Sequence, residues 1–301
     1  MQEKVSHYKA EIILLFVTVS WGLSFPTIKI GLNYISPVFF VFIRFTLTLI
    51  IFYLIFRKKL ALLKKENIFK GIILGIFLFS GFLTQTIGLK YTTASNSAFI
   101  TGTNILIIPF AQILIIRKYP KFENILGIIV AIAGMYYLTG IEDMIINIGD
   151  LFTFLCAISF AFQIVMLDYF SRTTDYLSLI YGQFIAMSVF SLATALVFEI
   201  AVSNELLFIP NYYLLFVILF NTVFSTLIAL FLSGKYQKYT TPVKAGLIYN
   251  SEVVFAVIFA YMILNEVLSG KQITGALLIL AGVLISEFSG ELFKKKKNEM
   301  P

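Results

Sequence analysis

The sequence has few charged residues, one cysteine and one histidine. Only 13% of its 301 residues are charged, whereas 59% are hydrophobic; in soluble domains about a quarter of the residues are charged. A soluble core of this size could not bury so much apolar surface, so lipid must solvate much of the chain. The lone cysteine, Cys156, excludes an intrachain disulfide, and we interpret it as a small buried apolar residue.

The shortage of histidine and the absence of several motifs exclude further activities. His7 alone, in the polar N-terminal stretch, supports neither a zinc cluster nor a histidine-based triad, so we predict no metal site and no catalytic residues. The G-x-x-x-x-G-K-[ST] sequence of ATP motors is missing, as are H-E-x-x-H and G-x-S-x-G. We therefore predict that the protein is not an enzyme and uses no cofactor. A membrane-embedded enzyme that uses carboxylates is the alternative.

Apolar runs long enough to cross a bilayer make up most of the chain. A helix needs about 20 apolar residues to cross a hydrocarbon core of about 30 Å. Ten such runs occur, at residues 11–31, 37–56, 68–89, 93–116, 122–139, 149–170, 177–198, 212–234, 240–264 and 271–288. They show no period-two alternation, which excludes membrane strands. The first run holds Trp21, Pro26 and Lys29, and we interpret it as a retained helix rather than a signal peptide.

The distribution of basic residues predicts the orientation. With the N-terminus in the cytoplasm, 19 of the 23 lysines and arginines lie on the inner side, and the exceptions are Lys29, Arg44, Lys90 and Lys271. The opposite loops carry Glu142, Asp143, Glu199, Glu205 and Glu266. This asymmetry predicts a multi-pass protein of the cell membrane with both termini in the cytoplasm. It also explains the net charge of +7, so we predict lipid rather than nucleic acid as a partner.

A repeated tetrapeptide divides the chain into two halves. Lys90-Tyr91-Thr92-Thr93 recurs as Lys238-Tyr239-Thr240-Thr241, at an offset of 148 residues. The same offset aligns small residues, pairing Gly127 with Gly275, Ala133 with Ala281 and Gly134 with Gly282. We therefore expect a first five-helix repeat over residues 1–139 and a second over 149–288, followed by a basic cytoplasmic tail over 289–301.

An odd number of spans in each repeat inverts the second half. The predicted fold is thus an all-α integral membrane protein with ten transmembrane helices in two inverted five-helix repeats. Inverted repeats are typical of secondary transporters, which bind a small-molecule substrate near the midplane between the halves. A duplicated channel is the alternative. The sequence leaves the solute, the coupling mode and the oligomeric state open.

Several segments together resemble one transporter family. Residues 88–102, GLKYTTASNSAFITG, are similar to the junction between the third and fourth helices of EamA-type carriers of the drug/metabolite transporter superfamily. Trp21-Gly22, Pro37 with Arg44-Phe45, and Asn265-Glu266 before Gly275 also fit. The resemblance implies ten helices in two inverted halves, and export or exchange of amino acids or other small metabolites without ATP.

Two charges lie deep in apolar runs and are candidates for the substrate cavity. Arg44 is about eight residues into its run, or roughly 12 Å at 1.5 Å per residue. Glu252 is about 12 residues into its run from the other side, which places it at a similar depth in a core of about 30 Å. Buried charges in membranes are costly and usually functional. We expect the two to meet, either as a structural ion pair or as a site that handles substrate or protons.

The other cavity candidates are polar or aromatic side chains within the apolar runs. They are Trp21, Gln85, Ser97, Thr101, Asn104, Gln163, Gln183, Asn221 and Tyr249. Ser97, Thr101 and Asn104 lie on one helical face, which we expect to face a cavity or a partner helix. Interhelical hydrogen bonds are the alternative for each polar residue. We assign the small residues Gly71, Gly75, Gly127, Ala131, Gly134, Gly275 and Gly282 to helix packing.

Overall fold

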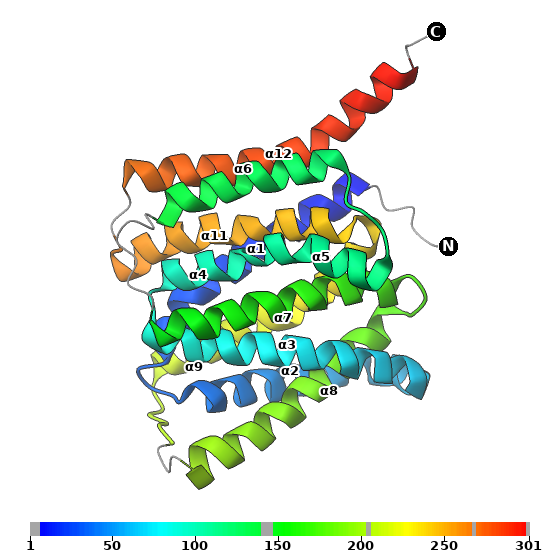
Figure 1. Cartoon of the computed structure of the whole chain (residues 1–301). Helices are drawn as coiled ribbons and strands as arrows, with labels where there is room; N and C mark the ends of the chain where they lie inside the picture. The colour runs from blue at the N-terminus through cyan, green and yellow to red at the C-terminus, as the bar shows by residue number, and fades with distance from the viewer. Residues whose placement is uncertain (1–6, 140–146, 203–205, 267–268, 299–301) are drawn as a thin grey trace.

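A computed structural model describes residues 7–139, 147–202, 206–266 and 269–298. These residues form a bundle of long helices that run back and forth (Figure 1). The helices of the first half are α1 (His7–Gly31), α2 (Pro37–Leu60), α3 (Lys65–Tyr91), α4 (Ala94–Gly102), α5 (Asn104–Ile116) and α6 (Phe122–Thr139). The α-helices of the second half are α7 (Ile148–Ser171), α8 (Tyr176–Thr194), α9 (Tyr212–Phe220), α10 (Ala229–Tyr236), α11 (Pro242–Leu264) and α12 (Gly270–Asn298). Between them lie the π-helices η2 (Ala195–Val202) and η3 (Asn221–Ile228) and the 3-10 helix η4 (Gln237–Tyr239).

The described residues form eight helices that are long and apolar enough to cross a membrane. Two shorter apolar helices, Phe122–Tyr137 and Ile273–Ile285, lie within α6 and α12. The structure therefore agrees with a multi-pass, all-helical protein, but eight rather than ten of the predicted runs meet the length and composition of a span. The predicted outer-loop residues Glu142, Asp143 and Glu205 lie outside the described residues.

Three of the predicted spans are interrupted rather than continuous, and in the run 177–198 the π-helix η2 replaces the α-helix from Ala195 onward. The run 93–116 is broken at Thr103, whose backbone and side chain both donate to the carbonyl of Ile100, at 3.1 and 2.6 Å. Such i−3 bonds tighten the backbone locally and compete with the regular helical bond. The run 212–234 contains the π-helix η3, in which Thr226 Oγ1 donates to the carbonyl of Asn221, five residues earlier, at 2.7 Å. π-Helical turns inside helices are frequent at functional sites.

Glycines allow the helices to pack closely, as the sequence predicts. A Cβ atom on Gly134 of α6 would lie 2.7 Å from the carbonyl oxygen of Gly275 in α12, and one on Gly282 would lie 2.6 Å from that of Gly127. A Cβ atom on Gly75 of α3 would lie 2.6 Å from the Cβ atom of Ala186 in α8. Side chains at these positions would push the helices apart, so packing accounts for these glycines.

The two copies of the repeated tetrapeptide have the same local structure. In each copy the last threonine caps the following helix: Thr93 accepts from the backbone N–H of Asn96 at 3.1 Å, and Thr241 from that of Lys244 at 3.3 Å. Threonine is a favoured N-cap because its hydroxyl satisfies a free N–H of the first turn. The capped helices α4 and α11 begin at opposite ends of the bundle (Figure 1). We call the end where α1 begins and α12 ends the terminal end, and the other the distal end.

Candidate functional site

A cavity lies between the helices of the two halves. Its volume, counted as the space open to the centres of water molecules, is about 50 Å³. One water needs roughly 10–15 Å³ by this measure. Its lining residues are Trp21, Ser24, Phe25, Leu78, Phe82, Gln85, Asn104, Phe160, Gln163, Ile164, Leu167, Gln183, Leu230, Ser233, Gln237, Tyr249 and Glu252. The cavity therefore has mixed apolar and polar walls, and its volume is that of a few water molecules.

The cavity brings together seven of the eleven residues predicted from the sequence. They are Trp21, Gln85, Asn104, Gln163, Gln183, Tyr249 and Glu252, and they come from α1, α3, α5, α7, α8 and α11. The other four, Arg44, Ser97, Thr101 and Asn221, do not line it. Residues far apart in the sequence thus converge on one space, and both halves of the chain contribute.

Glu252 is the only acidic side chain among the lining residues. It lies near the middle of α11 and is 8% exposed. Within the described part of the chain its carboxyl group makes no hydrogen bond and no ion pair. A carboxylate in a low-dielectric site without a partner is costly and tends to be retained for function. Glu252 is therefore the group in this cavity best placed to bind a cationic group or a proton.

The aromatic wall of the cavity is held by hydrogen bonds. The rings of Trp21 and Tyr249 pack edge to face, with centroids 5.1 Å apart. Trp21 Nε1 donates to the carbonyl of Ser225 at 3.0 Å, and Tyr249 Oη donates to Gln237 Oε1 at 3.2 Å. These bonds fix the two rings as one aromatic wall of the cavity, which Glu252 also lines.

The polar candidates differ in what they contact. Gln163 Nε2 donates to Gln183 Oε1 at 3.2 Å, which joins α7 to α8 across the cavity wall. Gln85 Nε2 donates to Thr101 Oγ1 at 3.1 Å, so Thr101 lies behind Gln85 and supports it. Asn104 Oδ1 is buried and has no hydrogen-bond partner among the described residues. Asn104 is thus the amide with most capacity left for a ligand.

Ser97 and Asn221 make interhelical contacts instead of lining the cavity. Ser97 Oγ lies 3.4 Å from Thr153 Oγ1 of α7, and Asn221 Nδ2 donates to Thr27 Oγ1 of α1 at 3.3 Å. This is the alternative that the sequence left open for every polar residue in a span.

The expected contact between Arg44 and Glu252 is not formed. Arg44 is fully buried, and its Nε donates to Thr226 Oγ1 at 2.5 Å while Nη2 lies 3.5 Å from Ser225 Oγ. The ion pairs within the described residues are Lys121–Glu123, Arg172–Asp168 and Lys244–Glu11. Two residues at the same depth in the membrane can still lie on helices that are far apart. Here α2, which carries Arg44, packs on α8 and η3 rather than on α11, which carries Glu252. Arg44 and Glu252 are instead buried in separate surroundings.

The distal end of the bundle is closed by backbone contacts. Residues Ile35 and Phe208 face each other in an isolated antiparallel bridge, with Ser36 N donating to the Leu207 carbonyl at 2.9 Å. Nearby, the carboxylate of Glu199 accepts from the N–H groups of Val38 and Phe39 at 2.8 and 2.9 Å. An acidic group at a helix N-terminus is stabilising. The carboxylate therefore ties η2 to the start of α2 above the cavity.

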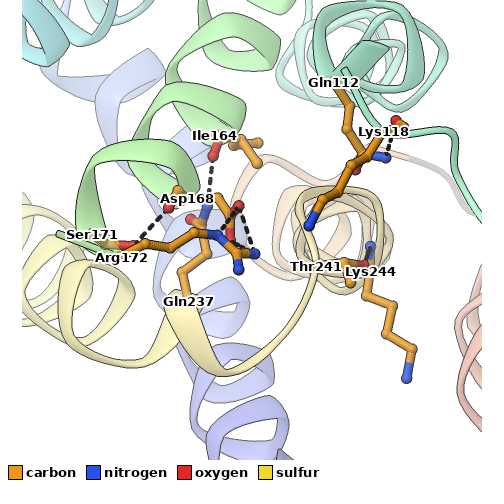
Figure 2. Close-up of polar contacts among 9 residues, drawn as sticks. All are labelled: Gln112, Lys118, Ile164, Asp168, Ser171, Arg172, Gln237, Thr241 and Lys244. Carbon is orange, nitrogen blue, oxygen red and sulfur yellow. Dashed lines mark hydrogen bonds and ion pairs between the residues drawn. The ribbon is translucent and has the colours of Figure 1, made fainter. Parts of the chain in front are cut away.

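Polar contacts cross the terminal end of the cavity (Figure 2). Gln237 Nε2 donates to the carbonyl of Ile164 at 2.6 Å, and both residues line the cavity. Beside them, Arg172 makes three hydrogen bonds to the buried carboxylate of Asp168, at 3.0, 3.1 and 3.0 Å. Gln237 was not predicted from the sequence, because it precedes a helix cap and reads as part of a loop. The Gln237 hydrogen bond thus joins η4 to α7 at the cavity wall.

The family assignment comes from comparison with known proteins. The EamA-like transporter family model matches residues 8–140 and 147–288. The chain belongs to this family. An uncharacterized transporter of Archaeoglobus fulgidus is 33% identical to this EamA-like transporter over 287 residues, covering 94% of this chain and 87% of the relative. The uncharacterized transporter YoaV of Bacillus subtilis is 23% identical over 292 residues, covering 94% and 97%.

The fold of this EamA-like transporter also occurs in a solved structure. A crystal structure with 15% sequence identity superposes with a TM-score of 0.76 and covers 96% of this chain and 99% of that chain. At this identity the likeness shows the fold alone. Together, the family match and the relatives confirm the resemblance seen in the sequence and support membrane transport as the class of function.

Proposed function

We propose that this EamA-like transporter moves a small metabolite, such as an amino acid, across the cell membrane by secondary transport, as an exporter or exchanger. The observation that carries the proposal is the cavity between the two halves, which contains Glu252 without a protein partner among the described residues. The solute binds in the cavity against the Trp21 and Tyr249 rings, and Asn104 and Glu252 supply the polar contacts. The backbone contacts between residues 34–36 and 207–209 form a barrier at the distal end, and the hydrogen bond from Gln237 to Ile164 forms one at the terminal end. During transport these two barriers open alternately.

Reciprocal contacts support an inverted repeat. Residues 127 and 275 are related by the offset of 148, as are 134 and 282. Gly134 faces Gly275 while Gly282 faces Gly127, and this exchange of partners is expected when a two-fold axis relates the halves. The equivalent helices α6 and α12 run in opposite directions (Figure 1), which requires the axis to lie across the helices. We therefore place α6 and α12 as the fifth and tenth spans of two inverted repeats, 1–139 and 149–288.

Counterflow in proteoliposomes tests the function. Vesicles loaded with unlabelled amino acids should take up a radiolabelled trace of the same amino acids transiently above equilibrium, because a carrier exchanges solutes one for one. A metabolite-export screen of cells with and without the protein selects the labelled solutes. Uptake without saturation or counterflow would indicate a channel, and chemical conversion of the solute would indicate an enzyme.

Cysteine labelling tests the orientation, in which the terminal end faces the cytoplasm. Leu62 in the α2–α3 connection is 83% exposed, and Tyr212 at the distal start of α9 is 71% exposed. In intact cells an impermeant maleimide should label Tyr212→Cys and not Leu62→Cys, since only the distal end meets the medium. The unaltered chain, whose Cys156 is buried, is the unlabelled control. Labelling of Leu62→Cys from outside would show that the orientation is reversed.

A further inference from the structure

We propose that Arg44 is a second substrate-binding group, specific for a carboxylate, and that Phe82 covers it in the present conformation. The proposal rests on the proposed transport function and deepens it: Arg44 is the residue that selects, among small metabolites, those that carry a carboxylate beside their ammonium group. Glu252, in one wall of the cavity, binds the ammonium group. Arg44, which lies behind the Phe82 ring in another wall, binds the carboxylate.

Arg44 carries a positive charge that pairs with no carboxylate among the described residues. The side chain is fully buried in α2, and the contacts described above are to the hydroxyls of Thr226 and Ser225. Nη1 is buried and has no hydrogen-bond partner among the described residues. An unpaired guanidinium inside a membrane protein costs several kcal/mol, which a structural role alone does not explain because hydroxyls do not neutralise it.

A single aromatic ring separates this guanidinium from the cavity. The guanidinium carbon of Arg44 lies 4.8 Å from the centroid of the Phe82 ring and 5.4 Å from that of Phe45. Phe82 and its packing partner Phe160, 5.2 Å away, both line the cavity. The cation is thus stabilised by the faces of these two rings. Rotation of the Phe82 side chain exposes Nη1 to a solute in the cavity.

The Arg44 site is also connected to the cavity wall through η3. Ser225 contacts Arg44 with its side chain and accepts the Trp21 Nε1 hydrogen bond with its carbonyl. Trp21 in turn packs on Tyr249 next to Glu252. A carboxylate bound to Arg44 is therefore linked through Ser225 of η3 to Trp21, and so to the aromatic wall of the cavity.

The chemistry of a guanidinium selects a carboxylate. Arginine presents planar N–H donors that match two carboxylate oxygens, and charge-assisted bonds of this kind are stronger than neutral ones. An ammonium group offers Nη1 no acceptor, and a neutral solute offers at most an uncharged acceptor, which leaves the charge of Arg44 unpaired. With Glu252 on the other side, a zwitterion neutralises both buried charges at once, whereas a molecule with one charge leaves the other unpaired.

Competition in the counterflow assay tests this assignment. The probes are leucine, leucinamide, which lacks the carboxylate, and 4-methylpentanoate, which lacks the amine. The labelled solute is any amino acid that shows counterflow with the wild-type protein. Leucine should compete about 10- to 100-fold better than leucinamide with the wild type, the range expected for a charged hydrogen bond. Arg44→Gln should bring the two within about twofold. Arg57→Gln, an exposed arginine on the same helix, is the matched control and should keep the wild-type ratio.

The outcomes separate the two proposals. If no amino acid shows counterflow with the wild type, the proposed function fails. If counterflow occurs and Arg44→Gln keeps the wild-type preference for leucine over leucinamide, the carboxylate assignment is overturned and the function stands. If Arg44→Gln does not fold, Arg44→Met, which keeps a long side chain without the charge, decides: a reduced preference supports the assignment and an unchanged one overturns it. Chloride-dependent transport that becomes chloride-independent in Arg44→Gln, with the leucine preference unchanged, would assign the site to an inorganic anion instead.

Discussion

Replacing Glu252 by glutamine should slow counterflow by at least about tenfold, the effect of losing one charged hydrogen bond, without lowering the stability of the protein. The carboxyl group lines the cavity and has no described protein partner, so Glu252→Gln keeps the side-chain shape and removes no protein contact. Removal of a lone buried charge leaves stability unchanged or raises it. Counterflow rate and melting temperature should be measured on the same preparation.

The control for this variant is Glu66→Gln, an exposed glutamate in the first turn of α3. It removes the same charge far from the cavity and should transport at the wild-type rate. A Glu252→Gln protein that transports normally would remove Glu252 from the site. A variant that is inactive because it melts well below the wild type would instead point to a structural role for the carboxyl group.

A disulfide across the distal end should stop transport reversibly. Ile35 and Phe208 face each other in an antiparallel bridge, and the flanking bonds are from Ser36 N to the Leu207 carbonyl and from Ile209 N to the Tyr34 carbonyl. Facing residues of this type have Cα atoms about 4.5 Å apart, within the range that a disulfide spans. If the distal end must open in each cycle, oxidised Ile35→Cys/Phe208→Cys should lose nearly all counterflow, and dithiothreitol should restore it.

Each single cysteine variant treated with the same oxidant is the control and should remain active. Cys156 is buried and present in every variant, so it does not account for a difference between them. Full activity of the crosslinked double variant would mean that the solute does not pass through the distal end between α1, α2 and the segment before α9.

The sequence predicts the membrane class and much of the cavity, because a polar or aromatic residue within an apolar run is visible without a structure. Glu252, Trp21 and Tyr249 were found in this way, and the structure places all three in one wall. Gln237 was missed because it lies beside a helix cap, where polar residues are ordinary. Local sequence alone does not distinguish a cavity residue there from a loop residue.

The sequence alone does not predict which helices are neighbours or where a helix is interrupted. Arg44 and Glu252 were matched by depth, but depth says nothing about rotation around the helix axis or about which helices are neighbours. The break at Thr103 and the π-helix η3 depend on which carbonyl each threonine hydroxyl contacts, as with Thr226 and Asn221. These contacts arise from packing, so a hydrophobicity pattern contains no sign of them.

The position of the solute is tested most directly by the fluorescence of Trp21. Trp21 is the only tryptophan in the chain and lies in the cavity wall, 5.1 Å from the Tyr249 ring. A solute identified by counterflow should change this fluorescence saturably, with a midpoint near the concentration that half-saturates transport, and Glu252→Gln should shift both. If the fluorescence stays unchanged at concentrations that saturate transport, the solute does not bind between Trp21, Tyr249 and Glu252.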